Sequence, residues 1–188
     1  VASMSQMMDY SNRFWPNLPY LPIIVPILVT LAVVAVIGAV NGFMIAKLKM
    51  LPFIATYGMS TIVYGINCLY FSKEPNNSQP IGGIREDLKF LSSYKLFGQI
   101  SLLVVIAVAA IIIVWFVLNK TVFGKNIYIV GGSPEAAKVS GINVHKIIIA
   151  VFIIESCLVG LAGIMEVART GGANSSYGNA YEFDAISS

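Results

Sequence analysis

The chain has 188 residues, of which 57% are hydrophobic and only 11% are charged, and its formal net charge is +3. Soluble domains carry roughly 25% charged residues, so the composition excludes an ordinary soluble domain and indicates a protein embedded in a lipid bilayer. The few positive charges are scattered, which disfavours a nucleic-acid-binding role. We therefore predict an all-α, polytopic membrane bundle.

The first part of the chain predicts an interfacial segment followed by a transmembrane span. Residues 1–21 are polar and aromatic, and rings such as Trp15 are typical of headgroup depth, although they also suit stacking against a sugar. The apolar run at residues 22–46 exceeds the ~20 residues that a bilayer core requires. Gly38, Ala39 and Gly42 give this span a small face for close helix packing.

Two more spans are predicted at residues 52–71 and 100–118, separated by the longest polar loop, in which 85–91 suits a short interfacial helix. Asn41 in the first span and Asn67 in the second need hydrogen-bonding partners. Each side chain either lines a polar path or bonds a neighbouring helix, and the sequence does not separate the two interpretations.

The polar segment at residues 120–146 carries strong signals for a short, separately capped helix. Ser133 is a good N-cap, and Pro134 suits the first helical position. Glu135 lies in the first turn, near the positive end of the helix dipole. Gly141 can end the helix in the left-handed conformation.

One side of this predicted helix is small, because Ala137 and Gly141 are four residues apart, as are Ala136 and Ser140. A helix with a small face and a charged rim at a membrane surface suits close docking of another protein. A solvated surface helix without a partner is the alternative.

The fourth predicted span, residues 147–168, contains two carboxylates. Ionisable groups at membrane depth usually face the bundle interior or a wet cavity. Glu155 lies about midway along the span, so we expect it to be protonated or paired with a group from another helix. Glu166 and Arg169 are three apart near the helix end and can pair on one face.

Four alternating spans place the short turn after the first span and the 120–146 segment on one side of the membrane. Both sides carry six basic residues, but the lysines of this side lie closer to the span ends, so the positive-inside rule predicts that it is cytoplasmic. These lysines are Lys47, Lys49, Lys120, Lys125, Lys138 and Lys146.

Motifs for catalysis or for metal binding are missing from the sequence. Gly124-Lys125-Asn126 lacks the hydroxyl and the glycine spacing of a phosphate-binding loop. The single histidine, His145, and two cysteines within apolar runs do not form a metal set. A nucleophile with a base and an orienting group is likewise not readable. We predict no enzyme activity and no metal site.

Several motifs resemble those of bacterial ABC-transporter permeases of the ribose/galactose (monosaccharide) importer family. Ser133–Gly141, with Glu135-Ala136-Ala137 and Gly141, is similar to the cytoplasmic loop of these permeases. The segments 41–47, 52–56, 79–81, 165–169 and 181–186 resemble further motifs of the family. Residues 63–67 and the Glu166–Arg169 pair favour its galactose/methyl-galactoside branch. Glu155-Ser156 departs from the small Ser-Gly pair that is usual there.

This resemblance implies that residues 1–188 form a single transmembrane permease domain, expected to be a piece of a longer multi-pass protein of the bacterial inner membrane. It implies a homodimer that binds a cytoplasmic ABC ATPase through Ser133–Gly141 and receives a monosaccharide from a periplasmic sugar-binding protein. ATP and Mg²⁺ would be bound by the ATPase, and this chain would hold no cofactor. Two alternatives stay open: an ion-coupled secondary carrier that uses Glu155, and a structural membrane subunit.

Overall fold

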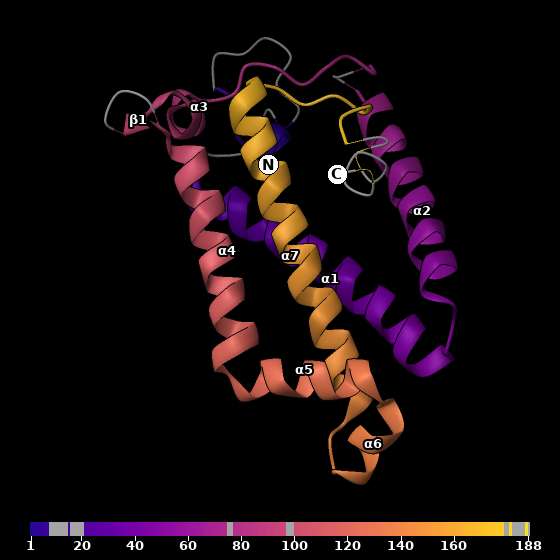
Figure 1. Ribbon diagram of the computed structural model, residues 1–188. Helices are drawn as coiled ribbons and strands as arrows, with labels where there is room; N and C mark the ends of the chain where they lie inside the picture. Colours follow the sequence, from indigo (N-terminus) through magenta and orange to yellow (C-terminus); the bar gives the residue numbers. More distant parts are fainter. Residues whose placement is uncertain are drawn as a thin grey trace.

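The computed structural model describes residues 1–7, 15, 21–74, 77–96, 100–178, 181 and 187 (Figure 1). This part of the chain is mainly helical, which confirms the predicted fold class; its strands are a two-residue antiparallel ladder. The elements in chain order are η1 (Ala2–Met4), α1 (Ile24–Leu48), α2 (Pro52–Ser72), α3 (Glu86–Ser93), β1 (Lys95–Leu96), β2 (Ile100–Ser101), α4 (Leu102–Lys120), α5 (Val122–Gly132), α6 (Pro134–Val139) and α7 (Val144–Thr170).

The predicted spans correspond to α1, α2, α4 and α7, and their ends differ from the predicted ends by at most three residues. Among the described residues, α1, α4 and α7 are long and apolar enough to cross a membrane. Helix α2 has 21 residues, but its glycine, serine, threonine and tyrosine residues make it less apolar. Composition therefore supports three of the four predicted spans directly.

Helices α1 and α7 cross in the middle of the molecule and form its most extensive helix contact (Figure 1). Small residues permit the close approach, as predicted for Gly38 and Gly42. A Cβ atom added to Gly38 would lie 2.6 Å from the carbonyl oxygen of Phe152, and one added to Gly42 would lie 2.8 Å from the Cα atom of Ile149. Neither position has room for a side chain.

Helix α4 is held mainly at its two ends. It packs on α5 at one end and on α3 and β2 at the other. Between these ends α4 runs beside α7 (Figure 1), and an apolar groove separates their side chains.

The end of the bundle near α3 has its own small core. Phe71, Ile81, Ile84, Leu88 and Ala168 are buried there together. Backbone bridges tie residues 6 to 84 and 81 to 173 in this region. The predicted helix at 85–91 is confirmed as α3. Trp15 was predicted to lie at headgroup depth or to stack against a sugar, and the choice between the two stays open. Its Nε1 donates to the Tyr70 hydroxyl at 3.2 Å.

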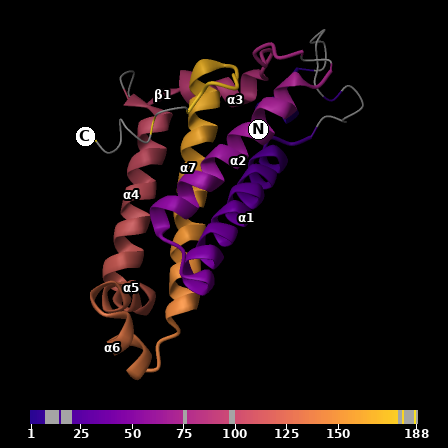
Figure 2. The same cartoon turned by 90° about the vertical axis from the view of Figure 1, so that its right-hand side faces the viewer.

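The opposite end of the bundle holds the α1–α2 turn together with α5 and α6, as Figures 1 and 2 both show. This arrangement confirms that the two basic connections lie on the same side of the bundle. Helix α5 lies across the end of α4, and α6 projects beyond it (Figure 2). The 181–186 segment lies, apart from Tyr181, outside the described residues.

Candidate functional site

Helix α6 is the predicted capped helix, and its ends form for the predicted reasons. The Ser133 hydroxyl accepts from the Ala136 backbone N–H at 3.2 Å, and Pro134 occupies the first helical position. Gly141 has φ of +75°. Its N–H donates to the Lys138 carbonyl at 3.0 Å. The N–H of Ile142 donates to the Ala137 carbonyl at 2.9 Å, which completes a Schellman motif.

Of the small residues in and directly after α6, Ala137 is buried, whereas Ala136, Ser140 and Gly141 are exposed. Ala137 is 0% exposed and packs with Val130 of α5 and Val144 of α7. This cluster fixes α6 against the two helices that flank it in the chain. Ala137 is therefore used for close packing inside the segment, and docking through the other small residues, Ala136 and Gly141, stays a prediction.

The outward face of α6 carries different residues. Glu135, Ala136 and Lys138 are exposed, and Val139 is 90% exposed. Glu135 makes no hydrogen bond or ion pair with the described residues. A protruding valine beside a free carboxylate and an ammonium group gives this face both an apolar contact point and charges of either sign. We call Glu135, Lys138 and Val139 the α6 face.

Helix α5 was not predicted from the sequence. Its N-cap is Thr121, whose hydroxyl accepts from the Gly124 backbone N–H at 3.2 Å. Gly124 lies directly on the Leu118 carbonyl at the end of α4, where a side chain would not fit. Thr121, a residue type that caps helices, was the sequence signal for the start of α5. Residues of low helix propensity follow it and hide the helix: Gly124, Asn126, Gly131 and Gly132. Helix α5 supplies Val130, the support on which α6 rests.

The two asparagines occupy different settings. Asn41 lies on α1, and its Oδ1 atom is buried with no hydrogen-bond partner among the described residues. Asn67 lies on α2, and its Nδ2 donates to the Ser175 carbonyl at 3.4 Å. Both asparagines were expected to need a hydrogen-bonding partner. The structure gives Asn67 a backbone partner, whereas Asn41 Oδ1 has none within the described part of the chain. The two residues do not share a contact that would make one site.

Glu155 lies on α7 beside a groove of about 630 Å³ between α4, α5 and α7. The other residues that line the groove are apolar or weakly polar. Glu155 is exposed and forms no hydrogen bond or ion pair with the described residues. The predicted need for a partner is thus not met by α1, α2, α4 or the rest of the described chain.

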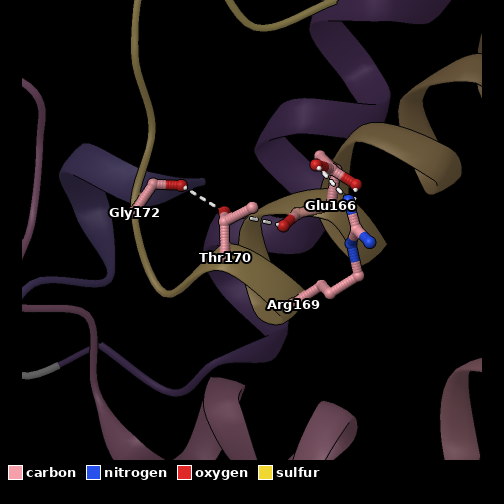
Figure 3. Close-up of polar contacts among 4 residues, drawn as sticks. All are labelled: Glu166, Arg169, Thr170 and Gly172. Carbon is pink, nitrogen blue, oxygen red and sulfur yellow. Dashed lines mark hydrogen bonds and ion pairs between the residues drawn. The ribbon is translucent and has the colours of Figure 1, made fainter.

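Glu166 and Arg169 form the predicted pair at the end of α7 (Figure 3). Arg169 donates from Nε to Glu166 Oε2 at 3.2 Å and from Nη2 to Oε1 at 3.1 Å. The Thr170 hydroxyl lies close by and donates to the Glu166 carbonyl at 2.9 Å. The Arg169 side chain is 66% exposed, so the pair belongs to the outer rim of the bundle and not to its interior.

The four predicted polar residues, Asn41, Asn67, Glu155 and Glu166, are therefore not brought together in one pocket. Within the described ranges, His, Cys, Asp and Glu side chains do not gather in a group of three that would hold a metal ion. The part of the molecule that is best organised for a partner is the α6 face, presented by local caps on a supporting helix.

Comparison with known proteins places the whole chain in one family. Residues 1–188 match the family described as "Branched-chain amino acid transport system / permease component". The chain is 42% identical to a galactose/methyl galactoside import permease protein of Haemophilus influenzae and 39% identical to that of Escherichia coli; each match covers 98% of this chain and 55% of the relative. It is 34% identical to a ribose import permease protein of Escherichia coli, over 87% of this chain and 50% of the relative.

The chain thus spans about half the length of the curated relatives it matches. No solved structure matches it. These relatives confirm the resemblance to ribose and galactose importers that the sequence motifs indicated.

Proposed function

The chain belongs to the permease-component family and is a multi-pass α-helical protein of the inner membrane, and from this premise we propose that it acts in the membrane-spanning permease subunit of an ATP-driven sugar importer. Its proposed cargo is a monosaccharide of the galactose or methyl-galactoside type. The names and identities of the galactoside and ribose relatives support this assignment. ATP hydrolysis itself is assigned to a separate ATPase subunit.

The observation that carries the proposal is the α6 face. Helix α6 is capped at both ends, rests on the Val130–Ala137–Val144 cluster and projects Glu135, Lys138 and Val139 away from the bundle. A rigid projecting helix with a free carboxylate is suited to seating in a groove of another protein. We propose that this partner is the cytoplasmic ABC ATPase, so that the α5–α6 end of the bundle is cytoplasmic, in agreement with the lysines at that end.

The proposed mechanism transmits motion through this contact. When ATP binding closes the ATPase subunits, they push on the α6 face. Because α6 is packed on α5 and α7, a displacement of α6 moves the end of α7, and α7 in turn is locked to α1 at Gly38 and Gly42. The bundle then changes between outward-facing and inward-facing arrangements, as a population shift between two packings.

Two further partners complete the proposal. A second copy of the permease would provide the other half of the sugar path. A periplasmic sugar-binding protein would deliver the sugar to the α3 end of the bundle, which lies opposite α6 (Figure 1).

Sugar uptake by the complete transporter in proteoliposomes tests the assignment. Glu135→Lys reverses the free charge of the α6 face without touching a contact inside the chain, and we expect it to abolish ATP-dependent uptake while the sugar-binding protein still docks. Lys125→Glu, a charge reversal at an exposed position of α5 outside the α6 face, is the matched control and should retain uptake. Normal uptake by Glu135→Lys would refute the coupling role of α6.

The same vesicles distinguish the ion-coupled carrier. Uptake by the ATP-driven importer survives collapse of the proton gradient and stops without ATP. A carrier that used Glu155 as its proton site would show the reverse dependence.

A further inference from the structure

The groove between α4 and α7 contains a carboxyl group, that of Glu155, which has no ion-pair or hydrogen-bond partner among the described residues. Glu155 is the twelfth of the 27 residues of α7. At 1.5 Å rise per residue it lies about 17 Å from the first residue of the helix and about 22 Å from the last. The carboxyl group is therefore close to the middle of the bilayer core, where an ionisable group is expensive unless it is paired or hydrogen-bonded.

The lining of the groove limits what can occupy it. Val114 and Val117 on α4, Phe123 on α5 and Leu158 on α7 are among its walls, and Glu155 is its one charged group in the described part of the chain. A monosaccharide carries several hydroxyl groups that require donors and acceptors on every side. One carboxylate in an apolar groove does not meet this requirement, so these walls by themselves do not form a sugar site.

The shape and position of the groove suit a helix. Helix α4 is anchored at its ends by α5 and by α3 with β2, and the groove and its continuation towards Arg169 follow the length of α4 and α7. A segment of a helical bundle that crosses the membrane with one side towards lipid is helical, because its N–H and C=O groups then find partners inside the segment. An apolar helix with one donor side chain matches both the walls and the carboxyl group.

We propose that this groove seats a further transmembrane helix of the same permease subunit, and that this helix presents a hydrogen-bond donor, cationic or neutral, to Glu155. The galactoside relatives have 45% of their length outside the matched region, which is enough for such a helix. The pairing locks the register of the added helix against α4 and α7. The inference does not depend on the identity of the sugar or on the α6 face.

Photocrosslinking in the complete subunit, in native membranes, tests the occupant. A photoreactive amino acid is placed at Val114 on the α4 wall and, in a separate variant, at Leu158 on the α7 wall. Both probes should capture one and the same helix, from outside residues 1–188 of the same polypeptide, with a donor side chain within one helical turn of the crosslink. Lipid adducts alone, different helices on the two walls, a helix of another protein or copy, or a helix without a donor would overturn the proposal.

Substitution of Glu155 tests the pairing itself. Interhelical hydrogen bonds in membranes average about 0.6 kcal/mol, which corresponds to roughly a threefold change in an equilibrium. We expect Glu155→Leu to lower the equilibrium constant for seating the helix by about that factor, read as a lower crosslinking yield from both walls, and Glu155→Gln to retain the yield because the amide oxygen still accepts. Truncation of the captured donor to alanine should reproduce the loss even if Glu155→Leu does not accumulate. An unchanged yield in the donor variant would overturn the pairing.

Discussion

The crossing of α1 and α7 makes a quantitative prediction for Gly38→Ala. The added Cβ would lie 2.6 Å from the Phe152 carbonyl oxygen, whereas ordinary contacts begin at 3.4 Å. The added Cβ would also crowd Ser156 Oγ, so the helices must separate by at least about 0.8 Å, the difference between these distances. A gap of 0.5–1 Å forfeits about a quarter to a half of the dispersion energy across a contact, and overpacked sites typically lose ~1–3 kcal/mol. We therefore expect Gly38→Ala to lower the free energy of unfolding by ~1–3 kcal/mol.

The assay is unfolding of the purified protein in mild detergent titrated with SDS and followed by tryptophan fluorescence. Gly163→Ala is the matched control, because Gly163 lies on α7 but a Cβ there meets nothing within 4 Å. The control should be as stable as the parent or slightly more stable, since alanine favours the helix over glycine. Equal stability of Gly38→Ala and the parent, or an equal loss in Gly163→Ala, would refute the packing account of this crossing.

The remaining predictions concern α6 and the rim of the bundle. Gly141→Ala should destabilise the end of α6 by about 1–2 kcal/mol, because φ is +75° there and left-handed backbone disfavours a Cβ; Gly131→Ala should not, and hydrogen exchange of the α6 amides measures both. Ser133→Ala should speed hydrogen exchange of the α6 amides, because it removes a cap worth about 1 kcal/mol. Ser133→Asp should leave this exchange unchanged, because aspartate also caps a helix. Glu166→Gln should change stability in the SDS titration by only ~0.2–1 kcal/mol, because its partner Arg169 is largely exposed; a larger loss would place the pair inside the protein.

Features with local causes were predictable from the sequence. The span positions follow from apolar length, and α6 follows from Ser133, Pro134 and Gly141, which act on neighbouring backbone groups. The Glu166–Arg169 pair follows from its spacing on one helix. For α6 and for the ion pair the interacting groups lie within one or two helical turns, so tertiary packing had little to add.

Features that depend on distant contacts were missed. Helix α5 contains glycines that weaken its local signal, and its start depends on the fit of Gly124 against Leu118 at the end of α4, where a side chain has no room. The burial of Ala137 was not predictable, because Ala136 and Ala137 are both small and only the meeting of Val130 with Val144 decides that Ala137 is the buried one. Glu155 has no partner among the described residues because a groove separates α4 from α7. The distance between two helices cannot be read from the periodicity of either one.

The central claim is that the outward face of α6 docks into a cytoplasmic ATPase, and crosslinking from Val139 tests it most directly. Val139→Cys, in the complete transporter lacking its native cysteines, should form a crosslink to the ATPase, and the thiol should be labelled by impermeant reagents only from the cytoplasmic side. Ala137→Cys, two residues away but buried, should do neither. Labelling of Val139→Cys from outside the cell, or failure to capture the ATPase in the assembled transporter, would contradict the account.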